Sequence, residues 1–262
     1  MTNVFIDTHC HLDAAEFIGQ QDAVVREAQE AGVAALVLPA IERANFAAVQ
    51  TLCAQFKNCT PAYGIHPMCV DRATPADLDV LRGYLAQADT VAVGEIGLDF
   101  FVEGYDQEKQ EFYFAEQLKL AREFDLPVLL HIRRAQDIVL RHLRQHKVSG
   151  IAHAFSGSRQ QADEFIKLGF KLGFGGAMTY SRATRLRALA ATLPLECIVL
   201  ETDAPDIPPD FLERGSPNKP EYLPRIARTL TELRGVSLAE IARVTTENAL
   251  SVLPKIKPSQ HL

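Results

Sequence analysis

The stretch Val4-Phe-Ile-Asp-Thr-His-Cys-His11 contains the pattern from which the fold of this 262-residue chain is predicted. It opens with a short apolar run that is typical of a buried strand, and acidic and imidazole side chains follow directly. Asp7, His9 and His11 are spaced two residues apart, so in extended backbone all three project to one face. A strand that ends in such side chains indicates a site at the carboxyl end of a sheet or barrel.

Seven more short apolar or β-branched runs follow the first, and segments of helical character separate them. This alternation favours parallel strands joined by crossover helices. We expect strands at 4–8, 35–39, 60–64, 90–94, 127–130, 150–154, 170–174 and 197–201. Eight such units in a chain of this length predict an α/β fold, a closed (β/α)8 TIM barrel, which takes about 250 residues.

The signals at the ends of helices and the even composition along the chain predict a single domain over residues 1–262. Gly32 is typical of a helix end, Thr74-Pro75 of a helix start, and Ser237-Leu-Ala-Glu240 of a capping box that opens the last helix. No shift of composition marks a second domain, and 254–262 is expected to be a frayed tail.

The composition is that of a globular protein, with 47% hydrophobic and 23% charged residues. The longest apolar runs are shorter than the ~20 residues of a membrane helix, and Met1-Thr2-Asn3 leads into the first strand without a basic segment. Five cysteines, an odd number without a Cys-x-x-Cys pair, argue against a disulfide framework. We therefore expect a cytoplasmic protein that has no membrane partner and acts as a monomer.

The net charge of −6 bears on the class of binding partner. A broad footprint on duplex DNA depends on many Lys and Arg contacts to phosphate, which an acidic protein does not favour. A small local phosphate site remains compatible with this charge.

Polar side chains also stand at the ends of later predicted strands, where the active sites of barrels are built. A lone histidine is most often a hydrogen-bonded interior residue. Four imidazoles and two carboxylates at one rim, however, are costly to bury without a cation. The sequence therefore predicts a metal site formed by His9, His11, Glu95, His131, His153 and Asp203.

The number of these ligands predicts a centre with two divalent ions. Six protein ligands exceed the three or four of a mononuclear zinc site, so two ions bridged by Glu95 are the simpler arrangement. Two divalent ions, less the charges of Glu95, Asp203 and a bridging hydroxide, leave about +1 facing the substrate, which suits a phosphodiester. Imidazole suits zinc and manganese and carboxylate also suits magnesium, so the choice among Zn, Mn and Mg stays open.

Six motifs, spread over nearly the whole chain, resemble those of the TatD family of metal-dependent hydrolases. They are Asp7-Thr-His-Cys-His11, Gly64-Ile-His-Pro67, Gly94-Glu-Ile-Gly-Leu-Asp99, His131-Ile-Arg133, His153-Ala-Phe-Ser-Gly157 and Glu201-Thr-Asp-Ala-Pro205. Residues 153–176 and 178–187 are most similar to the YjjV-type branch.

This resemblance implies a TIM barrel of the amidohydrolase kind and a divalent-metal-dependent phosphoesterase or deoxyribonuclease. It implies one ion held by His9, His11, Glu95 and Asp203, and a second held by Glu95, His131 and His153. Gly-Phe-Gly-Gly at 173–176 is not a phosphate-binding loop, because it lacks the Gly-Lys-[Ser/Thr] ending that opens a helix. No residues that bind an organic cofactor are predicted.

The predicted reaction is hydrolysis of DNA ends or single strands by a metal-activated water. Glu95 and Asp203 are the catalytic candidates, with Asp203 accepting or directing the proton of the water. Two alternatives stay open. One is a hydrolase of a small-molecule amide, lactone or phosphoester, and the other is a metal-stabilised binding protein without catalysis.

Other residues near the predicted mouth have two readings each. His66 either contacts substrate phosphate or belongs to a strand-ending turn, and Arg133 either binds phosphate or forms a surface salt bridge. Asp7 and Glu201 are candidates for orienting the imidazoles. Three arginines are either phosphate ligands after the seventh strand or a solvated helix start: Arg182, Arg185 and Arg187.

Overall fold

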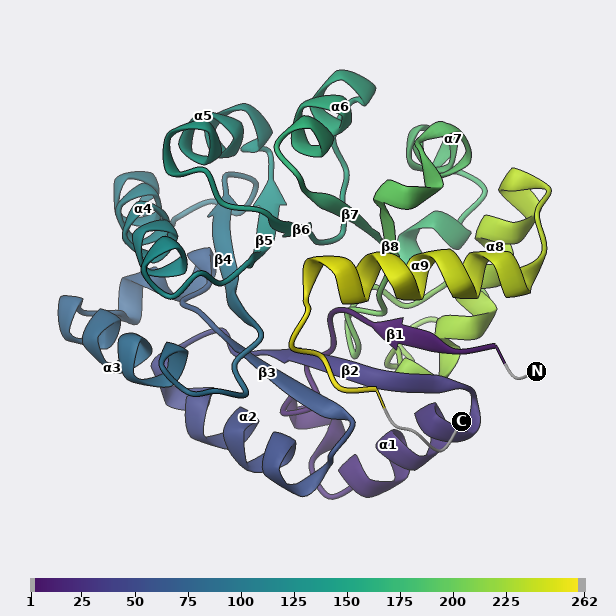
Figure 1. Ribbon diagram of the computed structural model, residues 1–262, viewed down its shortest axis with the longest axis horizontal. Coiled ribbons are helices and arrows are strands. Elements are labelled where there is room, and N and C mark those ends of the chain that lie inside the picture. Colours follow the sequence, from purple (N-terminus) through teal and green to yellow (C-terminus); the bar gives the residue numbers. More distant parts are fainter. Residues whose placement is uncertain (1–2, 259–262) are drawn as a thin grey trace.

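The strands form a barrel in the computed structural model of the protein, which describes residues 3–258 (Figure 1). Every strand pairs in parallel with its neighbour in chain order, from the first to the eighth. They are β1 (Phe5–Asp7), β2 (Val33–Pro39), β3 (Cys59–Tyr63), β4 (Ala92–Asp99), β5 (Val128–Arg133), β6 (Gly150–Ala152), β7 (Lys171–Phe174) and β8 (Ile198–Leu200). Each predicted strand overlaps an observed one, and the (β/α)8 prediction is confirmed.

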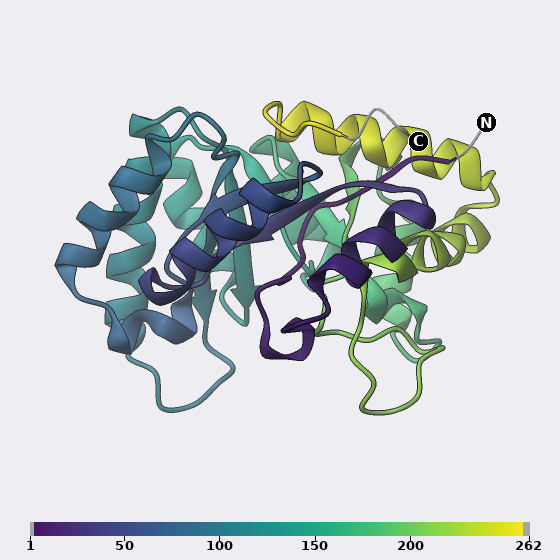
Figure 2. The same cartoon turned by 90° about the horizontal axis from the view of Figure 1, so that it is seen from below.

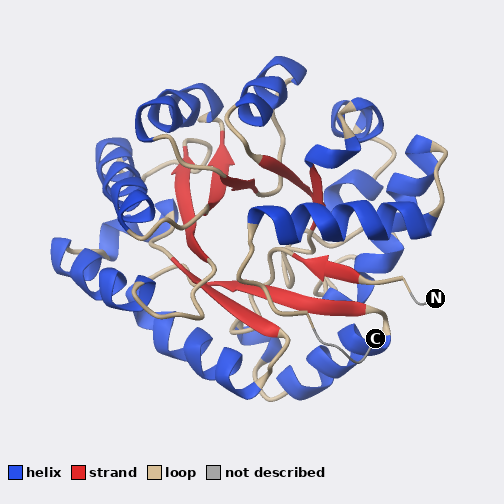
Figure 3. Ribbon diagram, viewed as in Figure 1, coloured by secondary structure: helices blue, strands red, loops and turns tan. Residues whose placement is uncertain are grey.

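Helices surround the strands as an outer layer (Figure 3). These are α1 (Gln21–Glu30), α2 (Arg43–Gln55), α3 (Pro75–Leu85), α4 (Gln107–Glu123), α5 (Gln136–His146), α6 (Arg159–Lys167), α7 (Thr184–Thr192) and α8 (Leu223–Arg234). A further helix, α9 (Leu238–Val252), lies across one end of the barrel. Short 3-10 turns complete the chain at Ala15–Phe17, Pro67–Arg72, Gly176–Thr179, Leu195–Cys197 and Pro220–Tyr222.

An apolar cluster closes the end of the barrel that α9 covers. Small and branched side chains from seven strands meet Ala249, Val252 and Leu253 of the α9 segment. Those from the strands are Ile6, Ala35, Val37, Ala62, Ala92, Leu129, Ile151 and Val199. Because this end is filled, any site inside the barrel must open at the opposite end.

The opposite end carries the longer connections. Figure 2 shows three of them projecting away from α9: residues 8–20 after β1, 100–106 after β4 and 201–219 after β8. They leave the carboxyl ends of their strands, where parallel barrels place their ligands.

The seam between β1 and β8 is joined by the residues that follow these two strands. The amide of Thr8 donates to the carbonyl of Leu200 (3.2 Å), that of Asp203 to His9 (2.9 Å), and that of His11 to Ala204 (2.7 Å). Predicted metal ligands therefore lie on backbone segments that close the barrel.

Strand β4 extends five residues farther than predicted. Its register with β5 shifts between Val93 and Ile96, and pairing then continues to Asp99. Gly97 permits this close pairing, because its φ is 148° and a Cβ there would overlap the carbonyl oxygen of His131. The whole Gly94–Asp99 motif, with Glu95, is therefore part of β4.

The ends of the helices mostly follow the sequence signals. Thr74 forms a capping box with Asp77 at the start of α3. Ser237 caps α9 by accepting a hydrogen bond from the amide of Glu240, but the Glu240 carboxylate pairs with Arg243 instead of completing the box.

The segment expected to be a frayed tail packs against the barrel for part of its length. Ile256 is buried in the cluster under α9, and Lys255 Nζ donates to the carbonyl of Thr90 (3.2 Å). Residues 259–262 of this segment lie outside the described residues. Among residues 3–258, no helix has the length and apolarity needed to cross a membrane.

Candidate metal centre

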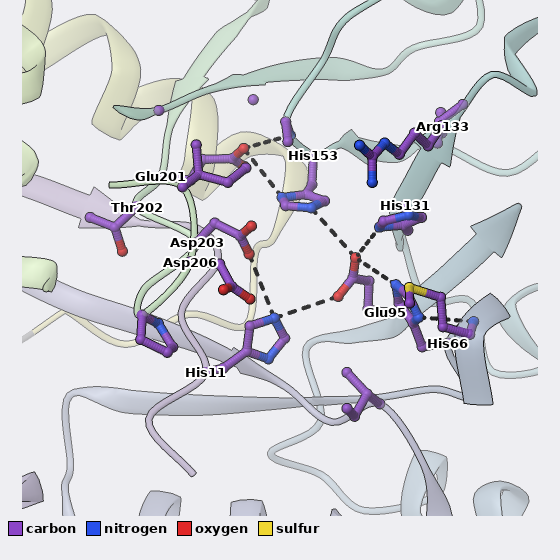
Figure 4. Close-up of a pocket in the computed structure, with 18 of the residues that line it drawn as sticks. His11, His66, Glu95, His131, Arg133, His153, Glu201, Thr202, Asp203 and Asp206 are labelled. Atoms are coloured by element: carbon purple, nitrogen blue, oxygen red, sulfur yellow. Dashed lines mark hydrogen bonds and ion pairs between the residues drawn. The ribbon is translucent and has the colours of Figure 1, made fainter. Parts of the chain in front are cut away.

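The predicted ligands meet at the open end of the barrel. A cavity of about 890 Å³ is lined by His11, Glu95, His131, His153 and Asp203, and His9 lies fully buried behind it. Glu95 and His131 belong to β4 and β5, His153 follows β6 directly, and the others follow β1 and β8. Figure 4 shows His11, His131 and His153 pointing toward Glu95, with Asp203 beside His11.

His9, His11 and Asp203, which we call the seam cluster, form one set of ligand atoms. His9 Nε2 lies 3.3 Å from His11 Nε2 and 3.7 Å from Asp203 Oδ1. His11 Nε2 lies 3.6 Å from Asp203 Oδ1. Ligands on a tetrahedral zinc ion at bond lengths of 2.0–2.1 Å stand about 3.3 Å apart, so this set suits one cation.

Glu95 Oε2 completes that set, at 3.2 Å from His9 Nε2 and 3.6 Å from His11 Nε2. Its other oxygen, Oε1, lies 3.0 Å from His131 Nδ1 and 3.4 Å from His153 Nε2. We call His131 and His153 the β5–β6 cluster. One carboxylate therefore presents one oxygen to each cluster, as a bridging ligand does.

Buried carboxylates stand behind both imidazoles of the β5–β6 cluster. Asp99 Oδ2 lies 3.0 Å from His131 Nε2, and Glu201 Oε1 lies 3.3 Å from His153 Nδ1. Glu201 fits because Gly173 has no side chain, and a Cβ there would overlap the carboxylate. Carboxylates in this position fix the tautomer and the orientation of metal-binding histidines.

Asp99 is a residue whose role the sequence analysis did not identify. The amides of Phe101 (2.9 Å) and Val102 (3.1 Å) donate to its other oxygen. Although burial opposes ionisation, these bonds and the one with His131 hold the pKa of Asp99 at about 2. The available signal was its position four residues after Glu95, because even spacing on a strand places two residues on one face.

Asp7 has a different role from the one expected. Its carboxylate accepts hydrogen bonds from the amide (2.9 Å) and hydroxyl (2.5 Å) of Thr202 and from the amide of His9 (3.2 Å). The side chain therefore ties β1 to the segment after β8 instead of orienting an imidazole ring. Burial raises its pKa to about 7.

The electrostatics of the centre match a site for cations. Burial opposes ionisation of Glu95, but His66, His9 and His153 hold its pKa well below the ordinary value. Burial lowers the pKa of His153, yet Asp203, Glu201 and Glu95 together raise it to about 10. The cluster thus stabilises positive charge, and metal ions would displace protons on binding.

His66 reaches the same centre, and with Glu95 and His131 it forms a group that could hold a metal ion, although the sequence did not predict it as a ligand. It follows β3, and its Nδ1 accepts a hydrogen bond from the amide of Met68 (3.1 Å). Burial lowers the pKa of His66, and because Nδ1 accepts this hydrogen bond, the ring hydrogen lies on Nε2. Nε2 lies 3.5 Å from Glu95 Oε1, and His66 lines the cavity.

Arg133, the last residue of β5, lines the cavity beside His131 (Figure 4). Its guanidinium stacks 3.7 Å from the centre of the Phe101 ring. Within residues 3–258 it forms no ion pair with a carboxylate, so the expected alternative of a surface salt bridge is not observed.

Comparison with known proteins relates this chain to TatD-like hydrolases. A sequence profile described as TatD related DNase matches residues 6–254. The uncharacterised metal-dependent hydrolase YjjV of Escherichia coli K12 is 43% identical over 252 residues, covering 95% of this chain and 97% of that protein. A Klebsiella pneumoniae protein named 3'-5' ssDNA/RNA exonuclease TatD is 33% identical over 236 residues, covering 87% and 90%.

The same relation appears in solved structures. The crystal structure of YjjV, described as a TatD homologue from E. coli K12, matches with a TM-score of 0.93 at 42% identity. The match covers 97% of this chain and 99% of that one. The resemblance to the YjjV-type branch is therefore confirmed.

Proposed function

The chain belongs to the family of TatD-related DNases, which are metal-dependent hydrolases, and we propose that it hydrolyses phosphodiester bonds at DNA ends or in single strands. We propose further that two divalent ions, zinc, manganese or magnesium, are bound. His9, His11, Glu95 and Asp203 would hold one of them, and Glu95, His131 and His153 the other.

The single observation that carries this proposal is the orientation of Glu95. Its Oε2 lies within 3.2–3.6 Å of the imidazole nitrogens of His9 and His11, and its Oε1 within 3.0–3.4 Å of those of His131 and His153. The carboxylate is 4% exposed, so its charge requires buried partners on both sides.

When bound, two divalent ions acidify a water molecule and neutralise charge on the departing oxygen. Asp203 is placed to receive the proton of that water, since its carboxylate lines the cavity and is held beside His9 and His11. Burial opposes its ionisation, but His153, His11 and His9 hold its pKa below the ordinary value.

Two further residues face the space where a phosphate would lie. His66 offers its Nε2 hydrogen, and Arg133 offers the free nitrogens of a guanidinium that Phe101 already positions. Hydrogen bonds from a charged donor to phosphate are short and strong. We therefore propose that these two side chains bind the non-bridging oxygens of the substrate.

The shape and charge of the mouth favour a single strand or a strand end over a duplex. The cavity lies between the connections after β1, β4 and β8, which project beyond the strands (Figure 2). A protein with a net charge of −6 does not provide the broad basic surface that binding along a duplex requires. The exonuclease name of the Klebsiella relative supports the same substrate class.

The test is an assay of protein reconstituted with each of the three metals. Labelled single-stranded DNA, duplex DNA and an activated phosphodiester are compared with a lactone and an amide as small-molecule substrates. We expect metal-dependent cleavage of the phosphodiesters, with the single strand cleaved faster than the duplex, and loss of activity on chelation.

A Glu95→Gln variant purified in the same way serves as the control for contaminating nucleases. Hydrolysis of the lactone or the amide alone would favour the small-molecule alternative. Failure of the fully loaded protein to cleave any phosphodiester would contradict the proposal.

A further inference from the structure

A second, smaller cavity adjoins the metal centre. It has a volume of about 240 Å³ and lies where the segment after β6 meets the start of α7. Ser156 and Leu186 line both this cavity and the main one, so the two lie side by side. The other lining residues are Gly157, Arg182, Ala183, Thr184, Arg185 and Leu189.

The charge of this smaller cavity is positive. Arg182 and Arg185 are the charged residues among those that line it. Within the described part of the chain, neither guanidinium lies within ion-pair distance of a carboxylate, whereas nearby Arg159 pairs with Asp163 at 2.9 Å. Two exposed arginines without counterions on an acidic protein leave a local positive field.

Both guanidiniums are also held in place by neutral groups. Arg185 Nη2 donates to the carbonyl of Ser156 at 2.9 Å, and Arg182 lies 4.8 Å from the centre of the Tyr180 ring. The Tyr180 hydroxyl in turn donates to the carbonyl of Pro208 at 3.0 Å. Within residues 3–258 the remaining N–H groups have no hydrogen-bond acceptor. An arginine positioned in advance loses little entropy when it binds an anion.

By contrast, Arg187 in the same segment is not part of this cavity. Its Nη1 donates to the carbonyl of Met178 at 2.9 Å, and it does not line the smaller cavity. Of the three arginines in the sequence motif, it is the one whose contact serves the backbone of the β7–α7 connection.

We propose that the smaller cavity binds a second phosphate of a single-stranded nucleic acid, one that is separate from the phosphate cleaved at the metal centre. This inference rests on the proposed function. A strand whose scissile phosphate lies beside Glu95 would pass Ser156 and Leu186 and place a neighbouring phosphate between Arg182 and Arg185. Guanidiniums suit this ligand because their paired N–H groups match two phosphate oxygens.

The experiment measures equilibrium binding of a labelled single-stranded oligonucleotide of about 10 nucleotides, a length within the usual range of single-strand sites. Wild type is compared with an Arg182→Ala/Arg185→Ala double variant at several salt concentrations. The control is Arg26→Ala/Arg243→Ala, which removes the same charge from exposed arginines on α1 and α9. Turnover of the oligonucleotide and of a short chromogenic phosphodiester is measured on all three proteins.

We expect the Arg182→Ala/Arg185→Ala variant to bind the oligonucleotide about tenfold more weakly. The slope of its binding constant against salt should be shallower by about 0.7, the value for one phosphate contact on a single strand. Its loss of kcat/KM should be larger on the oligonucleotide than on the short diester and should appear in KM. The control should behave as wild type.

Binding of the double variant equal to that of the control, equal loss of turnover on both substrates, or failure of wild type to bind the oligonucleotide would each overturn the inference. Failure of the proposed function has a different signature. In that case wild type would bind the strand through Arg182 and Arg185 but would cleave no phosphodiester.

Discussion

The seam cluster and the β5–β6 cluster face the same carboxylate, but the fold holds them in place in different ways. His9, His11 and Asp203 lie on segments that hydrogen-bond to each other through their backbones. Asp7 joins the same two segments by accepting a hydrogen bond from the amide of Thr202. His131 lies on β5 and His153 directly follows the adjacent β6, and each has a carboxylate behind its ring.

The two clusters therefore show two ways of holding metal ligands in place, one through the backbone and one through neighbouring side chains. At the seam, the backbone hydrogen bonds that close the barrel between β1 and β8 also fix the positions of His9, His11 and Asp203. At β5 and β6 the strand alone leaves the ring free to rotate, and a side chain from another element orients it. Glu95 is common to both, so its loss should affect both clusters.

The largest effect is expected from Glu95→Gln, which keeps the shape of the side chain and removes its charge. Metal affinity should fall at both clusters, and turnover should fall by at least about a hundredfold, more than loss of an outer partner costs. The fold should survive, because apolar packing of strands and helices stabilises it. Circular dichroism, metal content and phosphodiester turnover are the measurements, and two retained ions with near-native turnover would contradict the bridging role.

Removing the imidazole of His153 should weaken metal binding at the β5–β6 cluster and leave binding at the seam cluster intact. We expect His153→Ala to leave a single tightly bound ion, at the seam cluster, since His9, His11 and Asp203 keep their backbone supports. Elemental analysis after dialysis gives the stoichiometry. Loss of both ions, or retention of both, would show that the clusters are not independent in this way.

A smaller effect is expected when only the partner of a ring is changed. Asp99→Asn removes the charge behind His131 and should lower affinity for one ion by about 10- to 100-fold, with the other ion unchanged. Metal titration with a competing chelator measures both affinities. Glu201→Gln is the matched change behind His153, and equal weakening of both ions by either variant would argue against separate support.

The smallest effect on the centre, and a measurable one on stability, is expected at Asp7. Asp7→Ala leaves the amide of Thr202 buried without its acceptor, which should lower the free energy of unfolding by about 2 kcal/mol. Asp7→Asn keeps an oxygen acceptor and should cost less. Urea unfolding of both variants tests this, and equal stability of Asp7→Ala and wild type would refute the role of Asp7 at the seam.

The sequence was sufficient to predict the barrel and the meeting of the six ligands, because both follow from the alternation of strands and helices and from even spacing at strand ends. It was not sufficient for the partners of those ligands. The bond between Asp99 and His131 requires β4 to continue to Asp99 beside β5, whereas the strand predicted from the sequence ends at residue 94. Asp7 shares the spacing of His9 and His11, yet β1 ends at Asp7 and its side chain bonds to Thr202 instead.

The central claim is that Glu95 bridges two ions, one in each cluster. A crystal structure of the zinc- or manganese-loaded protein, with anomalous data collected at the absorption edge of the metal, tests it most directly. We predict two anomalous peaks about 3.5–4 Å apart, one beside Glu95 Oε2 and the seam cluster, the other beside Oε1 and the β5–β6 cluster. A single peak at saturating metal, or two peaks of which only one contacts Glu95, would contradict the account.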